Sequence, residues 1–274
     1  MPKIITVPVG GSIQIDPVES GFAHGFGLFE TIKLSAGSLA FWEAHWLRLK
    51  RSAALLGLEF CHSAEEGLEA VRRLACDHDL SNATIKLSLF RDEFGAKLYV
   101  YSRPQTQYGT SVKLLLNLGS PMNEHSILSG HKTHNYMENV LLLETAKLAG
   151  YDDMIRINTA GHLTECTMGN LFFFDGQILC TPPLEAGILP GTVRAAVLEI
   201  AASLSIEIKE GLFEPSDLSG AGAIFMTNSS VGILPVHSVE GIGTRYVARG
   251  SKLNQFDEMR SAFPEFERAH SVDL

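Results

Sequence analysis

Short apolar runs separated by turn residues dominate the chain between residues 153 and 236. Turn signals stand at 159–161 and at Asp175-Gly176. The strands expected around them are 153–158, 162–165, 170–175 and 177–180, followed by two more within 223–236. Because closely spaced turns join neighbouring strands of opposite direction, this pattern predicts an antiparallel or barrel-like sheet.

The first half of the chain mixes strands with two helices. Apolar alternation predicts a hairpin of 28–34 with 38–42 around a turn at Ala36-Gly37. Helical spacing predicts helices over 43–57 and 64–78. The further strands expected here are 3–9, 83–90, 97–102 and 112–118.

A stretch rich in Gly, Ser, Pro and Asn follows the first half and has no regular period. It predicts an interdomain linker. The domains expected are therefore a small N-terminal α/β domain over 1–118, a linker over 119–133 that carries Lys132, and a larger barrel-like α/β domain over 134–274. Helical spacing within the second domain predicts helices over 135–150, 191–204 and 246–263. The fold class expected is α/β (α+β) with two domains.

Composition limits the function. The chain has 274 residues, 45% of them hydrophobic, and a formal net charge of -9. The apolar share is typical of a folded core, and the negative charge argues against broad nucleic-acid binding. The four cysteines form no CxxC pair, so neither a zinc ribbon nor a disulfide scaffold is expected, and no metal site is predicted. Without a signal peptide or a long apolar run, a cytoplasmic protein with no membrane contact is expected.

Two segments are typical of phosphate-binding sites. Residues Gly191 and Thr192 begin a predicted helix, where free backbone N–H groups and the helix dipole attract anions. The small polar residues of TNSSVG at 227–232 stand at a bend and can donate further hydrogen bonds. Arg48 stands on a basic stretch of a predicted helix, either as a solvated charge or as a clamp on a phosphate. Each pattern alone is common in unrelated proteins.

Two ionisable residues allow more than one interpretation. Lys132 is a linker lysine that would ordinarily be solvated, but a buried lysine near other cations could serve as a nucleophile or base. Glu165 stands where a strand ends, and if it is buried it needs a partner such as a protonated pyridine nitrogen. No GxSxG, HExxH or P-loop pattern offers a rival chemistry.

Taken in order, these segments resemble the fold-type IV (class IV) family of pyridoxal-phosphate enzymes, which includes branched-chain and D-amino-acid aminotransferases and 4-amino-4-deoxychorismate lyases. The resemblance extends from about Gly21 to Val236. The segments that carry it are HGFGLFET at 24–31, HWLRLKRSA at 45–53, KTHNYMENVLLLETAKLAGYDD at 132–153, TECTMGNLFFF at 164–174, TPPLEAGILPGTVR at 181–194 and FMTNSSVGILPV at 225–236.

The resemblance implies a role for each matching residue. Lys132 matches the lysine that forms the Schiff base with pyridoxal 5'-phosphate, and Glu165 matches the glutamate that faces the pyridine nitrogen. The phosphate would be held by Arg48, by the helix-start residues Thr192 and Val193, and by Ser229 with its neighbour Asn228. Tyr136 is similar to a tyrosine near the phenolic oxygen, although one residue fewer separates it from the lysine than in the branched-chain enzymes. Thr31 and Ser230 are implied as substrate contacts.

The resemblance leaves the reaction open. The first hypothesis is an aminotransferase acting on a small amino acid and a 2-oxo acid. The second is a 4-amino-4-deoxychorismate lyase that releases 4-aminobenzoate and pyruvate. The third is a catalytically silent relative that binds a phosphorylated ligand. The resemblance also implies a homodimer with the cofactor bound between the two domains.

Overall fold

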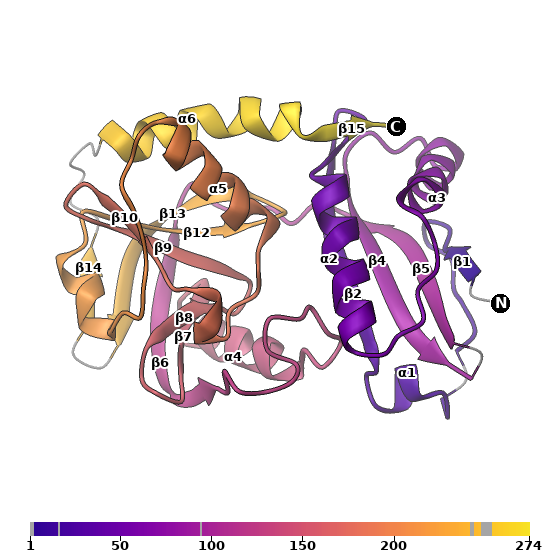
Figure 1. The fold of residues 1–274 in the computed structure, drawn as a ribbon, viewed down its shortest axis with the longest axis horizontal. Helices are drawn as coiled ribbons and strands as arrows, with labels where there is room; N and C mark the ends of the chain where they lie inside the picture. Colours follow the sequence, from indigo (N-terminus) through magenta and orange to yellow (C-terminus); the bar gives the residue numbers. More distant parts are fainter. Residues whose placement is uncertain (1–2, 16, 94, 242–243, 248–253) are drawn as a thin grey trace. The chain divides into compact units, whose positions relative to one another are not determined.

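A computed structural model describes residues 3–15, 17–93, 95–241, 244–247 and 254–274. Within them the chain forms two compact units. Unit 1 comprises Met1–Gln107, His131–Tyr136 and Glu267–Leu274, and unit 2 comprises Tyr108–Gly130 and Met137–Phe266. The two units differ in architecture, as Figure 1 shows for each.

Unit 1 is built on a six-stranded sheet with the order β1-β5-β4-β2-β3-β15. Only β1 pairs in parallel, with β5, and the other neighbours are antiparallel. Its strands are β1 (Lys3–Thr6), β2 (Gly27–Ser35), β3 (Ser38–Ala40), β4 (Ala83–Asp92), β5 (Gly95–Arg103) and β15 (Ser271–Asp273), and its helices are α1 (Ser20–Ala23), α2 (Trp42–Leu55) and α3 (Ala64–Asp77).

Helices α2 and α3 cover one face of this sheet. Trp42 and Trp46 of α2 and Leu74 of α3 pack with Ile32 and Ile85 of the strands in one buried cluster. Helix α3 begins with a capping box in which Ser63 and Glu66 satisfy each other's backbone N–H. The predicted hairpin and both predicted helices are present.

Unit 2 contains a closed barrel. Strand pairing runs β9–β12–β13–β6–β7–β8 and returns to β9, because β8 and β9 also pair. The strands are β6 (Val112–Met122), β7 (Asp153–Asn158), β8 (Leu163–Cys166), β9 (Gly169–Asp175), β12 (Ala223–Asn228) and β13 (Gly232–Gly241), with β10 (Ile178–Thr181), β11 (Ile208–Glu210) and β14 (Thr244–Val247) attached outside the ring. The predicted barrel-like sheet is thus confirmed.

Apolar side chains fill the barrel and cover part of its outside. Leu171, Phe173 and Met226 belong to the inner cluster. On the opposite face, Phe172 stacks on Phe225, whose ring also lies near Phe256. The helices of this unit are α4 (Met137–Leu148), α5 (Thr192–Ser203) and α6 (Asn254–Ala269), with the short helices η1 (Leu184–Ala186) and η2 (Pro215–Gly220).

Two predicted boundaries differ from the structure. The expected helix over 246–263 is wrong at its start, because Tyr246 lies in β14 and pairs with Val239, while the helix runs over Asn254–Ala269. The expected first domain ended at residue 118, but β6 continues to Met122 and hydrogen-bonds to β13 and β7, which places it in unit 2. Backbone pairing, not side-chain polarity, sets this division.

Candidate active site

The segment around Lys132 is bonded to unit 1 and does not behave as a loose linker. The amide of Phe29 donates to the Lys132 carbonyl at 2.8 Å, and the amide of His134 donates to the Gly27 carbonyl at 2.9 Å. The Lys132 Nζ lies 4.5 Å from the centre of the Phe29 ring and 5.5 Å from that of Tyr136. The structure therefore brings Lys132 and Tyr136 together around one aromatic ring.

A second lysine, Lys86, lies beside the same Phe29 ring, and the sequence patterns did not indicate it. Lys86 Nζ lies 4.1 Å from the centre of the Phe29 ring and donates to Thr31 Oγ1 at 2.7 Å. Burial, and then the positive charges of Lys132 and Arg103, lower the pKa of Lys86 to about 7. The predicted residue Thr31 thus touches an amine whose charge changes near neutral pH.

Arg48 lies in a buried charge network between α2 and β2. Its Nε and Nη2 donate to the two carboxylate oxygens of Glu30 at 2.8 and 2.6 Å, and His45 Nδ1 lies 2.7 Å from the same carboxylate. Burial alone would raise the pKa of Glu30, but the charges and hydrogen bonds of Arg48 and His45 hold it well below its usual value. Burial lowers the pKa of His45 despite the attraction of Glu30.

The sequence held a signal for this network. Glu30 stands in LFETIKL at an alternate position with Leu28 and Ile32, which face the core. A carboxylate on the apolar face of a strand needs a buried partner. Arg48 supplies that partner through its Nε and Nη2.

In unit 2, Glu165 is held at the point where β8 meets β9. Its Oε2 accepts hydrogen bonds from Asn170 Nδ2 at 2.9 Å and from the backbone amide of Leu189 at 3.1 Å. Asn170 also donates to the Leu189 carbonyl at 2.9 Å. These contacts tie the half-buried carboxylate to the loop that precedes α5.

The start of α5 lies against the same residues. A Cβ added at Gly191 would come within 2.0 Å of Asn170 Oδ1, so only glycine permits this approach. Thr192 and Val193 form the first turn of α5, where backbone N–H groups have no partner within the helix. Thr192 Oγ1 lies 3.3 Å from Ser229 Oγ. The two predicted phosphate-binding segments therefore meet.

The bend after β12 is organised by Asn228. Its Oδ1 accepts from the amides of Ser230 and Val231 at 2.9 and 3.1 Å, and its Nδ2 donates to Tyr108 at 3.3 Å. Asn228 thus acts as a turn former that presents Ser229 and Ser230. Each unit carries one group of the predicted site residues.

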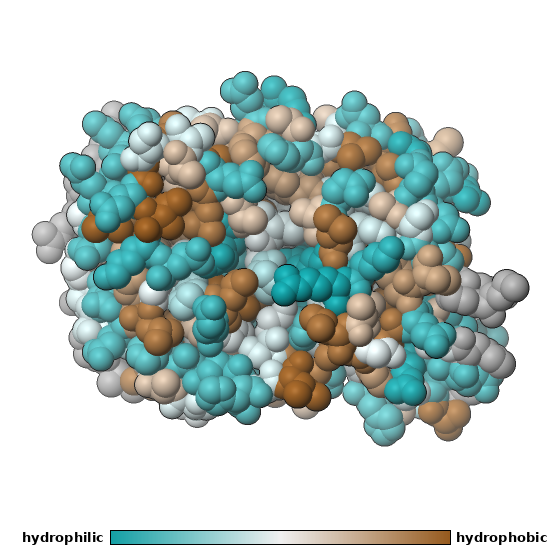
Figure 2. Space-filling view, in the orientation of Figure 1, coloured by the Kyte–Doolittle hydropathy of each residue, from teal (hydrophilic) through white to brown (hydrophobic). Residues whose placement is uncertain are grey.

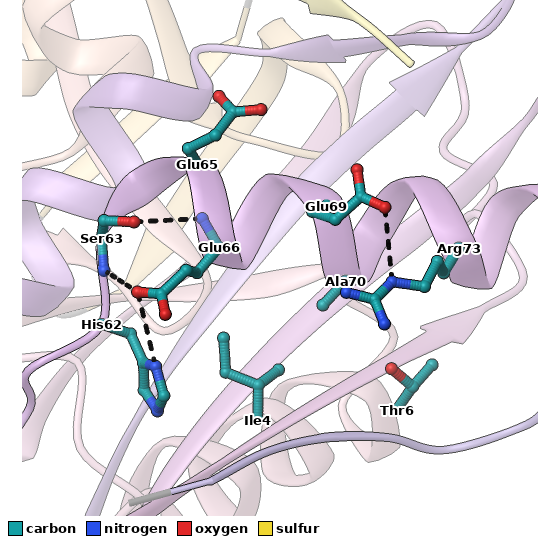
Figure 3. Close-up of a pocket in the computed structure, with 9 residues that line it drawn as sticks. All are labelled: Ile4, Thr6, His62, Ser63, Glu65, Glu66, Glu69, Ala70 and Arg73. Carbon is teal, nitrogen blue, oxygen red and sulfur yellow. Dashed lines mark hydrogen bonds and ion pairs between the residues drawn. The ribbon is translucent and has the colours of Figure 1, made fainter.

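A hollow on unit 1 offers a weaker candidate. Helix α3 and strand β1 line it, and none of the predicted site residues does. Several of its polar groups are already engaged with one another. The Ser63 and Glu66 side chains each accept from the other's backbone amide, Glu66 also contacts His62, and Glu69 pairs with Arg73 (Figure 3). On the face shown in Figure 2, hydrophobic residues form small groups among hydrophilic ones.

The described part of the chain contains neither a candidate metal site nor a candidate membrane-spanning helix. No three His, Cys, Asp or Glu side chains there are grouped so that they could hold a metal ion. None of the helices described is long and apolar enough to cross a membrane.

Comparison with known proteins gives a consistent result. The family model described as amino-transferase class IV matches residues 27–239. Aminodeoxychorismate lyase of Bacillus subtilis is 27% identical and the match covers 83% of this chain and 82% of that protein. Branched-chain-amino-acid aminotransferase of Escherichia coli is also 27% identical, over 80% of this chain and 78% of the relative. D-alanine aminotransferase of Listeria monocytogenes is 23% identical, over 93% of this chain and 94% of the relative.

Solved structures agree over nearly the whole chain. A Legionella pneumophila protein named "Putative 4-amino-4-deoxychorismate lyase" superposes with a TM-score of 0.88 at 27% identity, covering 97% of this chain and 100% of that one. Branched-chain aminotransferase of Escherichia coli superposes with a TM-score of 0.85 at 23% identity, covering 93% and 90%, and shares the fold.

Proposed function

Because the chain belongs to the class IV aminotransferase family, we propose that it transfers an amino group between a small amino acid and a 2-oxo acid. The enzymes of this family depend on pyridoxal 5'-phosphate, and this chain is one of them. The observation that carries the proposal is the fixed position of the Lys132 amine against Phe29 and Tyr136.

The donor groups present fit this cofactor. Lys132 is the amine that would hold its aldehyde carbon, and Glu165 is a carboxylate suited to a protonated ring nitrogen. In unit 2 the first turn of α5 with Thr192 and Val193 and the hydroxyl of Ser229 beside Asn228 suit a phosphate, and in unit 1 the guanidinium of Arg48 is a group of the same kind. Each type of group on the cofactor therefore has a matching residue.

The protein's part in the reaction is to place charges and move one proton. When bound, the cofactor draws electrons from the substrate's α-carbon and so makes the proton there acidic. Lys132, as the general base, would remove that proton and, in the second half of the reaction, would deliver a proton to the α-carbon formed from the 2-oxo acid. Asn170 and the Leu189 amide fix the Glu165 carboxylate, so it favours the protonated ring nitrogen without moving.

Replacing Lys132 tests the proposal. The purified protein should be yellow, and Lys132→Ala should lose the visible absorbance and at least a thousandfold of turnover, because no other group performs both of its tasks. Borohydride reduction should attach the cofactor covalently to the protein, and peptide mapping should locate it on Lys132. The matched control is Lys147→Ala, since Lys147 is an exposed lysine in the last turn of α4. A colourless wild-type protein in excess cofactor would contradict the proposal.

A lyase reaction is the second candidate, and two observations favour it. The Legionella protein matches this chain along its full length. The Thr31 hydroxyl, which stands where the lyases of the family have an active-site threonine although that residue type is common across the family, contacts Lys86 beside Lys132. The two reactions differ in one requirement, because only transamination needs a 2-oxo acid acceptor. Release of 4-aminobenzoate and pyruvate without an acceptor would replace the first candidate by the second.

We also propose a homodimer. Ile127, Met137, Leu141 and Leu148, on α4 and the segment before it, are each more than half exposed. Large exposed apolar side chains close together in sequence are typical of surfaces that bind another protein. Light scattering should give a mass twice the 29.9 kDa of one chain.

A further inference from the structure

Glu165, Asn170 and Thr227 stand opposite one another on three neighbouring strands. In the pairing register Glu165 faces Asn170 across β8 and β9, and Asn170 faces Thr227 across β9 and β12. On β12, Ile224 and Met226 belong to the core inside the barrel. Since side chains alternate along a strand, Thr227 points to the outer face, where Asn170 also points.

The hydroxyl of Thr227 is buried in an unusual state. The residue is 1% exposed, and its Oγ1 has no hydrogen-bond partner among the residues that the structure describes. Buried hydroxyl groups nearly always have a partner, because burying one without a partner costs free energy. Thr181, another buried threonine of unit 2, shows the usual arrangement, since its Oγ1 donates to the Leu171 carbonyl at 2.9 Å.

The neighbours of Thr227 indicate what the missing partner is. On one side lies Asn170, which holds the Glu165 carboxylate. Two residues further along the chain lies Ser229, whose hydroxyl faces Thr192 at the start of α5. Thr227 is thus placed between the group suited to the ring nitrogen and the groups suited to the phosphate.

We propose that Thr227 is a further cofactor-binding residue, whose hydroxyl finds its hydrogen-bond partner only when pyridoxal 5'-phosphate, or a water molecule held by it, is bound. This inference rests on the proposed function, because it requires that unit 2 bind this cofactor. It goes beyond the resemblance, which assigns roles to Asn228, Ser229 and Ser230 but none to Thr227.

The proposal predicts that one substitution, Thr227→Val, has opposite effects on the stability of the cofactor-free protein and on its affinity for the cofactor. Thr227→Val keeps the shape of the side chain and removes the hydroxyl. In the protein without cofactor, the variant should be as stable as wild type or more stable, since an unpaired polar group is removed from the interior. In the presence of cofactor the variant should bind it more weakly, since a hydrogen bond is lost.

The experiment compares wild type, Thr227→Val, Thr227→Ser and Thr181→Val. Thermal unfolding is measured after the cofactor is stripped with a carbonyl reagent, and the dissociation constant of added pyridoxal 5'-phosphate is measured by absorbance. We expect Thr227→Val to keep or raise the melting temperature of the stripped protein and to raise the dissociation constant about 3- to 10-fold. Thr227→Ser, which keeps the hydroxyl, should restore tight binding.

The controls separate this inference from the proposed function. Thr181→Val should lower the melting temperature of the stripped protein, because it loses a hydrogen bond that is already made. A dissociation constant for Thr227→Val equal to that of a wild type that binds the cofactor would overturn the inference alone. A wild type that binds no cofactor would overturn the proposed function and the inference with it.

Discussion

The two units hold their reactive groups by different physical means. In unit 1 one charge is placed by another, as Arg48 is by Glu30, and two amines lie near the same Phe29 ring. In unit 2 a single carboxylate, Glu165, is placed by the neutral groups Asn170 and Leu189 N–H. The candidate site residues of unit 1 are therefore held by electrostatics in a poorly solvated place, whereas Glu165 of unit 2 is held where the backbone approaches closely.

This difference predicts where each unit is fragile. Removing one of two charges that are buried together leaves the other without compensation, which strongly destabilises the fold. Hydrogen bonds from neutral donors, such as those to Glu165, contribute less individually, and their loss is local. The Glu30–Arg48 network should therefore respond most to a change of charge, and the surroundings of Glu165 to a change of shape.

The largest effect expected is that of Glu30→Gln. The substitution leaves Arg48, whose side chain is 9% exposed, without its charged partner. The free energy of unfolding should fall by about 3–5 kcal/mol, as is usual when one member of a buried ion pair is removed. Chemical denaturation at neutral pH measures it. The control is Glu69→Gln, which breaks the exposed pair with Arg73 and should leave stability unchanged within error. Equal effects of the two variants would contradict the comparison.

A smaller effect is expected from Gly191→Ala in unit 2. The added methyl group would overlap Asn170 Oδ1 and displace the side chain that holds Glu165. The free energy of unfolding should fall by about 2 kcal/mol, in the range of overpacked sites, and cofactor affinity should fall with it. Gly220→Ala serves as control, because no atom lies within 4 Å of the added carbon there. If Gly191→Ala binds cofactor normally, the close approach does not position Glu165.

The smallest effect concerns pH and Lys86. Its pKa is about 7 in the folded protein and 10.5 in an ordinary environment, so between these values the unfolded chain binds more protons. Stability that depends on Lys86 must then rise as the pH increases from 7 to 10. We expect the stability of wild type relative to Lys86→Met to rise by about 1 kcal/mol over this range, after allowance for solvent screening. Chemical denaturation of both proteins at pH 7 and pH 10 measures this difference. If the free energies of unfolding of wild type and Lys86→Met change equally between the two pH values, Lys86 keeps its ordinary pKa.

The sequence predicted elements better than it predicted the pairs between them. Turn signals and apolar periods located the hairpin at Ala36-Gly37, the helix start at Thr192 and the barrel-like sheet. The pairing of β15 with β3 was not predicted, because the three residues Ser271–Asp273 are too few to show a pattern that indicates which strand they pair with. The length of β6 was underestimated for a similar reason, since Ser120 and Pro121 are read as turn residues although the strand continues through them.

Roles in the candidate site were proposed only where a family pattern exists. Lys132, Glu165 and Arg48 were singled out by order and spacing, but Lys86 and Asn170 were not, since a single Lys or Asn in a strand has no distinctive neighbours. Their importance arises from register across strands, which places Lys86 opposite Thr31 and Asn170 opposite Glu165. Register is a property of the folded sheet, and a single sequence does not reveal it.

The chain enters unit 1 three times, and this has a consequence for synthesis. The sheet of unit 1 needs residues 1–107 first, then the segment with Lys132, and finally β15, which pairs with β3. A ribosome makes β15 after unit 2, so the edge of β3 stays uncovered while unit 2 is being translated. Uncovered strand edges invite pairing with other chains. β15, which follows unit 2 in the chain, therefore covers the edge of a sheet that was begun before unit 2, and that edge is exposed to pairing with other chains until β15 emerges.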